Sequence, residues 1–399
     1  MLSYEQYLRN SAVPKHVIDG FLDSSQRSWA QFHPELGYTL GNSLPRDGLD
    51  GCSTISTAQP NGARTAGIYT DQPCRINTYG NSFTQCHQVS DGETWQEYLA
   101  AHLGEPIRNF GMGGYGVYQA YRRMVSTEGT DDASDYVILY IWGDDHLRSL
   151  MRCRYAVIYP WWNNRDGLSF HNNFWANIEM DIELRELVEK DNLLPTPDSL
   201  YRMTDADFMA ESLADDLMVQ LSVVKQVDPS SLDFERLNAL AEILGVPGIS
   251  ETDPAGLQTW ANRLKYAYGF AATKSIIEKT VAFCGENDKA LMIVLLCPTA
   301  TRQLLRKQGR YDQEIVDFLN DKGLRYFDMN TVHFEDYQAF SLSVEDYLKR
   351  YYIGHYSPAG NHFFAYAIKS AIVDWLSPKP ITYRTDDSQL IDFQGYLAG

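Results

Sequence analysis

Short apolar runs alternate with segments of helical spacing along most of this chain. In the helical segments, apolar residues recur every three or four positions, which is typical of a helix that packs through one face. Strands that are separated by helices are expected to pair in parallel. The pattern therefore predicts an α/β fold, a three-layer sandwich in which helices cover both faces of a mainly parallel sheet. The predicted strands are residues 75–79, 106–110, 136–142, 291–296 and 324–327, and the predicted helices are residues 93–103, 117–124, 273–284, 312–320 and 363–375.

Residues 185–265 interrupt this alternation. Two apolar stripes with helical spacing follow one another there, from Phe208 to Val224 and from Leu237 to Leu244. We interpret this region as a helical insertion that forms a cap or an oligomerisation surface. Turn-forming residues dominate the start of the chain and predict loops and hairpins. The expected organisation is an N-terminal extension (1–70), a first core part (71–184), the insertion (185–265), a second core part (266–380) and a C-terminal tail (381–399).

Charge and composition narrow the set of partners. The 399 residues carry a formal net charge of −18. Such a field repels a nucleic-acid backbone or an anionic membrane at long range, so neither is an expected partner. No apolar run reaches the roughly 18 residues of a membrane span, and residues 1–6 lack the pattern of a signal peptide. The six cysteines form no CxxC pair, which predicts reduced thiols and a cytoplasmic protein.

A serine and a histidine are the candidates for nucleophilic chemistry. Ser82 follows the first core strand after the small turn Gly80-Asn81, and reactive groups gather at the carboxyl ends of parallel strands. His355 stands just before the last apolar helix, where it could serve as the base that activates a hydroxyl nucleophile. The alternative for Ser82 is a helix N-cap, and the alternative for His355 is a buried histidine that begins a helix.

Two further turns follow core strands. Residues 111–116 (GMGGYG) fit the G-x-G-x-x-G pattern of dinucleotide sites, but no acidic residue closes a following strand at the usual distance. Residues 142–146 (WGDDH) place two acids and a histidine side by side, without the spacing of metal ligands. Cys86 falls inside the helix expected after Ser82, and we interpret it as a buried thiol rather than a nucleophile. We therefore predict neither a cofactor nor a metal.

Taken in order, these turns resemble the blocks of the SGNH (GDSL-like) hydrolase superfamily. The resemblance rests on residues 80–84 (GNSFT in place of the family's GDS turn), on the glycine turn at 109–116, on the WGDDH turn and on His355. It covers about residues 35–180 and 265–376. It implies a flavodoxin-like SGNH fold in which Ser82 is the nucleophile and His355 the base. The N–H groups of Ser82 and Gly114 would then bind the oxyanion.

The chain departs from the family pattern at three positions. Asn81 stands where the family has aspartate, which is a mild change. Asp144 stands at the place of an asparagine that donates to the oxyanion, and an ionised aspartate only accepts hydrogen bonds. We therefore expect Asp144 either to be protonated at the oxyanion or to cap the following helix. Tyr352 replaces the aspartate that orients the histidine. The candidates for a substitute acid are Asp145, Glu345 and Asp346, and the alternative is a Ser-His dyad that uses a backbone carbonyl.

Aromatic residues suggest where a substrate would bind. Tyr115 lies in the glycine turn, Trp142 ends a predicted strand, and Trp161 and Trp162 lie in a loop that mixes rings with amides. Such a mixture suits a sugar or a cation, and the alternative is packing or a subunit contact. We predict a serine esterase that acts on a small-molecule or carbohydrate-linked ester. The alternative is a binding protein, or a lyase or isomerase, that reuses the pocket for a ligand such as a cation. A homo-oligomer also stays open.

Overall fold

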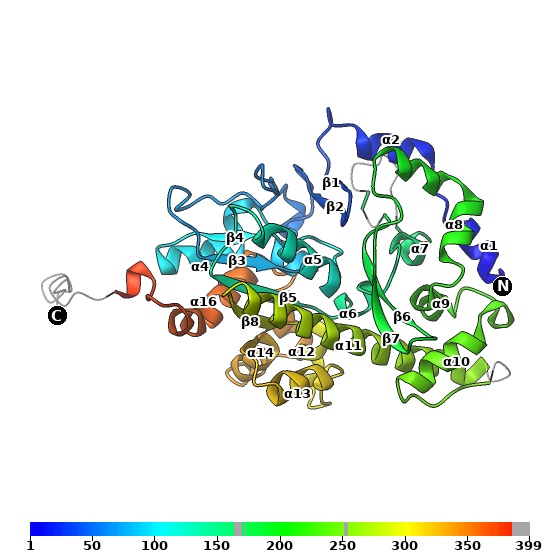
Figure 1. The fold of residues 1–399 in the computed structure, drawn as a ribbon. Coiled ribbons are helices and arrows are strands. Elements are labelled where there is room, and N and C mark those ends of the chain that lie inside the picture. The colour runs from blue at the N-terminus through cyan, green and yellow to red at the C-terminus, as the bar shows by residue number, and fades with distance from the viewer. Residues whose placement is uncertain (163–169, 172, 251–253, 385–399) are drawn as a thin grey trace, which may run out of the picture.

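The computed structural model describes residues 1–162, 170–171, 173–250 and 254–384. Its centre is a sheet of five parallel strands, which confirms the predicted α/β class (Figure 1). The strands follow one another across the sheet in the order β4-β3-β5-β8-β9. Their bounds are β3 (Ile76–Tyr79), β4 (Ile107–Asn109), β5 (Tyr136–Ile141), β8 (Ala290–Leu295) and β9 (Tyr326–Asp328).

The strand order marks where a ligand would sit. Numbered among themselves, the five strands run 2-1-3-4-5, and in doubly wound sheets of this order the crevice opens between strands 1 and 3. Those strands are β3 and β5, which pair in register from Ile76 opposite Tyr136 to Tyr79 opposite Leu139. The segments that leave their carboxyl ends therefore emerge side by side, and Ser82 lies on one of them.

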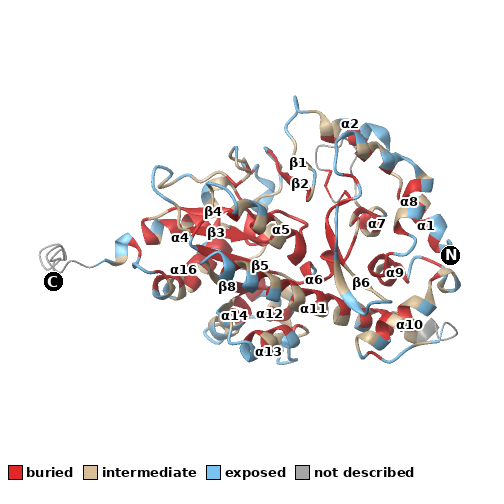
Figure 2. Ribbon diagram, viewed as in Figure 1, coloured by how far each residue is buried: buried red, intermediate tan, exposed pale blue. Residues whose placement is uncertain are grey.

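Helices cover both faces of the sheet, as the alternation predicted. Strand β5 is buried along its whole length because Ile138 and Tyr140 face one helical layer while Val137 and Leu139 face the other. This double burial explains its continuous apolar sequence. Figure 2 shows the central strands of the sheet and the helix sides that face them as buried. One layer holds α4 (Trp95–Leu103) and α16 (Pro358–Trp375), and the other holds α5 (Val117–Glu128), α11 (Pro254–Glu286) and α13 (Gln313–Asp321).

Helix α11 is longer than the predicted helix at 273–284. It begins at Pro254, inside the predicted insertion, and continues to Glu286 on the sheet. Leu257, Ala261 and Leu264 are buried on its first half, and the helix packs on α9 (Leu217–Val223) as well as on α5. One helix therefore joins the insertion to the core and runs without interruption through the predicted boundary at residue 265. The insertion also contains α8 (Ala206–Leu213) and α10 (Phe234–Ile243), and the hairpin of β6 (Asn177–Asp181) and β7 (Glu186–Lys190) crosses its predicted start.

The N-terminal region contains more than the predicted loops and hairpins. A hairpin is present, formed by β1 (Ala30–His33) and β2 (Gly37–Leu40), but two helices precede it. These are α1 (Tyr4–Arg9) and α2 (Lys15–Leu22), which bury Tyr4, Tyr7 and Leu8, and Val17, Ile18 and Phe21, respectively. Helix α1 packs on α8, so the start of the chain lies against the insertion (Figure 1). Helices this short carry too few turns for their apolar spacing to stand out in the sequence.

Six further helices lie in the segments that follow the strands of the sheet. They are α3 (Ser82–Gln85), α6 (Asp145–Arg148), α7 (Tyr155–Ile158), α12 (Pro298–Leu305), α14 (Met329–Tyr337) and α15 (Val344–Lys349). Residues 381–384 follow α16 with a single 3-10 turn, and the rest of the predicted tail lies outside the described residues. Among the residues that the structure describes, no helix has both the length and the apolar character to cross a bilayer.

Candidate active site

Ser82 occupies the first position of α3, directly after the tight turn that ends β3. Gly80 has φ +155°, and a Cβ there would lie 2.7 Å from the backbone oxygen of Tyr140, so the turn requires glycine. Asn81 is the N-cap of α3, and its Oδ1 accepts from the N–H of Phe83 at 2.7 Å. The N-cap role considered for Ser82 therefore belongs to Asn81, and the Ser82 hydroxyl is left for another partner.

That partner is His355. The Nε2 atom of its ring lies 2.7 Å from Oγ of Ser82, although the two residues are almost a whole chain apart. His355 stands in the turn between α15 and α16, and the N-cap of α16 is Ser357. The preceding Gly354 has φ +121°, and a Cβ there would lie 2.6 Å from Oε1 of Gln88. The turn is thus packed tightly against the residue that orients the histidine ring.

The amide of Gln88 provides this orientation. Its Oε1 accepts from the backbone N–H of His355 at 2.8 Å and lies 3.0 Å from Nδ1 of the ring. A backbone N–H only donates, so the amide atom facing both groups is the oxygen, and Nδ1 must carry a proton. Nε2 is then unprotonated and accepts from the hydroxyl of Ser82. This is the tautomer that a general base requires.

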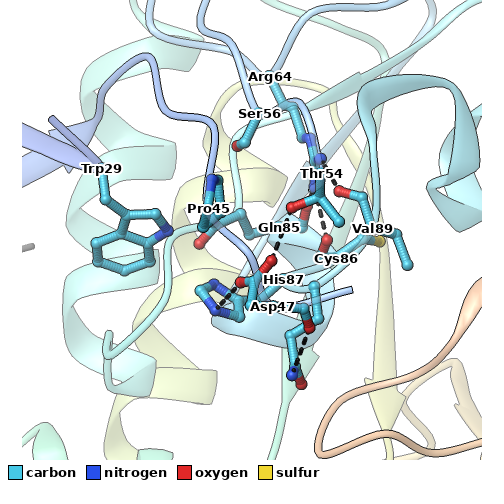
Figure 3. Close-up of a pocket in the computed structure, with 11 residues that line it drawn as sticks. Trp29, Pro45, Asp47, Thr54, Ser56, Arg64, Gln85, Cys86, His87 and Val89 are labelled. Carbon is cyan, nitrogen blue, oxygen red and sulfur yellow. Dashed lines mark hydrogen bonds and ion pairs between the residues drawn. The ribbon is translucent and has the colours of Figure 1, made fainter. Parts of the chain in front are cut away.

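A buried arginine holds the segment that carries Gln88. The guanidinium of Arg64 donates to the backbone oxygens of Gln85, Cys86 and Val89, and it pairs with Asp91 at 2.8 Å. Figure 3 shows Arg64 reaching this segment from the N-terminal region. The arginine thereby satisfies carbonyls at the end of α3 that have no partner within the helix.

Asp47 supports the same segment from a neighbouring loop. Its backbone oxygen accepts from Nε2 of Gln88 at 3.0 Å, and its carboxylate pairs with Nε2 of His87 at 3.0 Å. The hydroxyl of Thr54 donates to that carboxylate at 2.7 Å (Figure 3). With its nitrogen bound to Asp47, the amide of Gln88 can present only its oxygen to His355.

None of the acids considered for orienting His355 does so. Asp346 is exposed on α15 and accepts from Ser343, while Glu345 pairs with Arg302 and Arg306 on the surface. Asp145 lies by the asparagine of the serine turn, where its carboxylate accepts from Nδ2 of Asn81 and from the N–H of Trp142. These three predictions are corrected: a side-chain amide takes the acid's place. The predicted backbone carbonyl is likewise replaced by the side-chain carbonyl of Gln88.

The electrostatic surroundings keep His355 neutral. The pKa of His355 is lowered to about 3, mainly by burial and then by the charges of His87 and Arg148, with Asp47 opposing. A neutral imidazole can accept a proton from Ser82 at any pH above that value. However, no carboxylate contacts the ring among the described residues, so the imidazolium formed in a reaction would gain only the dipole of an amide.

Two backbone N–H groups are available beside Ser82. Neither the N–H of Ser82 nor that of Gly114 donates a hydrogen bond to any residue that the structure describes, and both residues line the pocket. The glycine turn is fixed to the serine turn, because Met112 donates to the backbone oxygen of Gly80 at 3.0 Å and Gly113 donates to Oε1 of Gln85 at 2.7 Å. A rigid pair of unused donors is what an oxyanion needs.

Asp144 does not lie at this position. Its side chain is 56% exposed, lies 3.6 Å from Nη2 of Arg148 and does not line the pocket. Helix α6 begins one residue later, and the Asp144 side chain makes no capping hydrogen bond to it. Both expected roles, at the oxyanion and as a side-chain cap, are therefore corrected. The acid that is buried here is Asp145, whose pKa is raised to about 7 by burial, with Arg148 opposing.

The pocket at Ser82 has a volume of about 660 Å³. Of the aromatic residues proposed to bind substrate, Trp142 and Trp162 line it. Trp161 is 66% exposed outside it, and Tyr115 is buried behind the glycine turn, where its hydroxyl donates to the backbone oxygen of Tyr38. Sequence reasoning missed several lining residues, which are Trp29, Asp47, Gln88, Arg148, Arg154 and His171.

Other chemistry finds less support near this pocket. Among the described residues, no group of three or more His, Cys, Asp or Glu side chains could hold a metal ion. Cys86 is buried, and burial raises the pKa of its thiol to about 12, which leaves it protonated and unreactive.

No protein-family model matches the sequence, and no curated protein matches it either. The residues of the pocket are therefore the basis for any functional conclusion.

Proposed function

We propose that the protein is a serine hydrolase of the SGNH type that cleaves carboxylic esters. The observation that carries the proposal is the 2.7 Å contact between Ser82 Oγ and an unprotonated Nε2 of His355. The unused N–H groups of Ser82 and Gly114 lie in the same pocket, at the crevice of the parallel sheet. The strand order 2-1-3-4-5 supports the finer assignment of a flavodoxin-like SGNH sandwich. The six free cysteines support a cytoplasmic location.

The reaction follows from these positions. His355 Nε2 takes the proton as Ser82 Oγ attacks the ester carbonyl, and the carbonyl oxygen becomes an oxyanion bound by the two N–H groups. The intermediate collapses, the alcohol leaves with the proton from Nε2, and an acyl-serine remains. Water then attacks the acyl group, again losing its proton to Nε2. The acid is released as Ser82 Oγ recovers its proton from His355.

The amide at position 88 limits the rate of this reaction. In a Ser-His-Asp triad the carboxylate stabilises the imidazolium and fixes the tautomer, and exchanging it for an amide can cost roughly 10⁴-fold when the tautomer becomes wrong. Here the tautomer is right, because the amide oxygen faces Nδ1. We therefore expect slow but measurable turnover, and good reaction with activated acyl donors.

The low pKa of His355 favours a second candidate function. A base with so low a pKa suits a pocket that binds a ligand without hydrolysing it, as in a binding protein or a non-hydrolytic enzyme. In that case a ligand would stabilise the protein equally well after Ser82→Ala, with no turnover of acyl esters. The two arginines that line the pocket argue against a cationic ligand in either case.

Labelling with a fluorophosphonate probe tests the hydrolase. We expect the intact protein to be labelled at one site, because the probe phosphonylates a serine whose proton a histidine can take. Ser82→Ala should abolish the label, and Ser230→Ala, at an exposed serine of the insertion, should retain it. An unlabelled wild type would contradict the proposed hydrolase and favour the binding function.

A further inference from the structure

Two arginines line the pocket that holds Ser82 and His355. They are Arg148, at the end of α6, and Arg154, just before α7. Burial, and then the charge of Arg148, lower the pKa of Arg154 to about 9, so the two guanidinium groups act on one another. Arg148 also lowers the pKa of His355. Two guanidinium groups therefore lie in the pocket of the reacting serine, in a chain whose net charge is −18.

The hydrogen-bonding capacity of Arg148 is only partly used. Its side chain is 8% exposed. Nη1 lies 3.2 Å from Oδ1 of Asp145 and 3.5 Å from the backbone oxygen of Tyr115. Nη2 lies 3.6 Å from Asp144, beyond hydrogen-bond distance, and Nε donates to none of the residues that the structure describes. A buried guanidinium with unmet donors is costly unless another acceptor completes them.

Asp145 does not fully compensate this charge. Its carboxylate is shared with Nδ2 of Asn81 and the N–H of Trp142, on the side of the serine turn. The guanidinium carbon of Arg148 also lies over the ring of Trp142, 5.2 Å from the ring centroid. This contact helps to hold the guanidinium in place, and a guanidinium suits a planar carboxylate that accepts two parallel hydrogen bonds.

We propose that the ester substrate carries a second, anionic group, a carboxylate, which Arg148 binds with Arg154 adding charge. The inference rests on the proposed hydrolase, since it names the substrate class of the same site. The rings of Trp29, Trp142 and Trp162 line the same pocket and would contact the apolar chain between the carboxylate and the ester. The carboxylate can belong to the acyl part or to the alcohol part of the ester.

Matched chromogenic esters test this substrate class in the wild-type protein. The anionic acyl ester is 4-nitrophenyl hydrogen glutarate, and its neutral partner is 4-nitrophenyl methyl glutarate. The anionic alcohol ester is 4-butyryloxybenzoate, compared with its methyl ester. We expect one anionic ester of the two pairs to exceed its neutral partner in kcat/KM by roughly 10- to 100-fold, the range of a hydrogen bond to a charged group. Equal rates within both pairs would overturn the proposal.

Variants of the arginine locate the effect. Arg148→Met should lower the anionic-to-neutral preference by about tenfold or more, Arg148→Lys should restore part of it, and Arg185→Met, at an exposed arginine of the hairpin turn, should leave it as it is. If Arg148→Met lowered both esters equally, Arg148 would act on the reacting carbonyl and the proposal would fail. Inhibition of the wild type by glutarate, but not by its dimethyl ester, would support carboxylate binding without the use of a variant.

A binding measurement separates this inference from the hydrolase itself. In Ser82→Ala protein, glutarate should raise the melting temperature, and the rise should be lost on adding Arg148→Met. That result together with an unlabelled wild type would leave the anion site standing while the hydrolase failed. Labelling of Ser82 with no glutarate effect and no anionic preference would overturn the anion site alone.

Discussion

The two sides of Ser82 are built from opposite kinds of groups. On the histidine side, which we define as His355, Gln88, His87 and Asp47, a neutral amide touches the base. On the arginine side, defined as Asp145, Arg148 and Arg154, a buried carboxylate touches an arginine and the serine turn. The acid that a triad would place behind the histidine is thus found on the other side. The comparison indicates that the site is suited to bind a negatively charged substrate and less suited to stabilise a protonated His355.

Removing the base should have the largest effect. We expect His355→Ala to lower kcat for an activated ester by roughly 10⁴-fold, because the Ser82 hydroxyl then has no proton acceptor. His362→Ala is the control, since His362 is exposed on α16 away from the pocket. Retained turnover in His355→Ala would mean that the histidine side plays no part in the chemistry.

Changing the amide on the histidine side comes next in size. Gln88→Ala should lower kcat by about 10- to 100-fold, because it frees the ring and leaves Nδ1 without its acceptor. Gln88→Glu places a carboxylate there, which should raise the pKa of His355 and move the acid limb of the pH–rate profile to higher pH. Its kcat should exceed that of Gln88→Ala by at least tenfold. If both variants behaved alike, the amide would be a packing residue and the contrast between the two sides would lose its meaning.

The charge state of the base can be measured directly. With a pKa lowered to about 3, His355 should stay neutral from pH 8 down to pH 5, whereas an ordinary histidine gains its proton across that range. A pH titration followed by NMR of the nine histidine rings measures the charge state of each. The signal that disappears in His355→Ala identifies the His355 resonance. A midpoint between pH 6 and 7 would contradict a neutral His355.

The smallest effect should come from placing asparagine, the residue of the SGNH pattern, at position 144. Asp144→Asn is expected to change kcat by less than about twofold, because the side chain is exposed and does not line the pocket. Asp145→Asn, one residue later and buried, should change it more, because Arg148 then loses a charged partner. A large gain in Asp144→Asn would return this residue to the oxyanion and correct our placement of it.

The fold could be predicted where a local pattern reflects burial. Strand β5 is apolar throughout because both of its faces are covered, and the strands around it alternate with helices that pack through one face. Small residues in the turn after β3 likewise pointed to Ser82, whereas Gly114 was indicated by the resemblance to the SGNH pattern. Half of α11 was missed because its first turns pack on the insertion rather than on the sheet.

The groups that tune the candidate site could not be predicted in this way. Gln88, Arg64 and Arg148 are polar residues in turns or short helices, and such positions are normally exposed. Their contacts depend on segments distant in sequence, as when Arg64 donates to the carbonyls of residues 85 and 89. The acids predicted to orient His355 show the opposite case. Asp346 is near His355 in sequence, but it is exposed to solvent on α15. Proximity along the chain says little about which polar groups share a pocket.

The hydrogen bonds from Arg64 to residues 85–89 make the N-terminal region part of the candidate site, although it lies outside the sheet. The backbone oxygen of Asp47 accepts from the amide of Gln88, the amide oxygen contacts His355 near the other end of the chain, and His355 contacts Ser82. Activity should therefore depend on an intact N-terminal region. A single protease cut before residue 70 should abolish activity while the sheet stays folded.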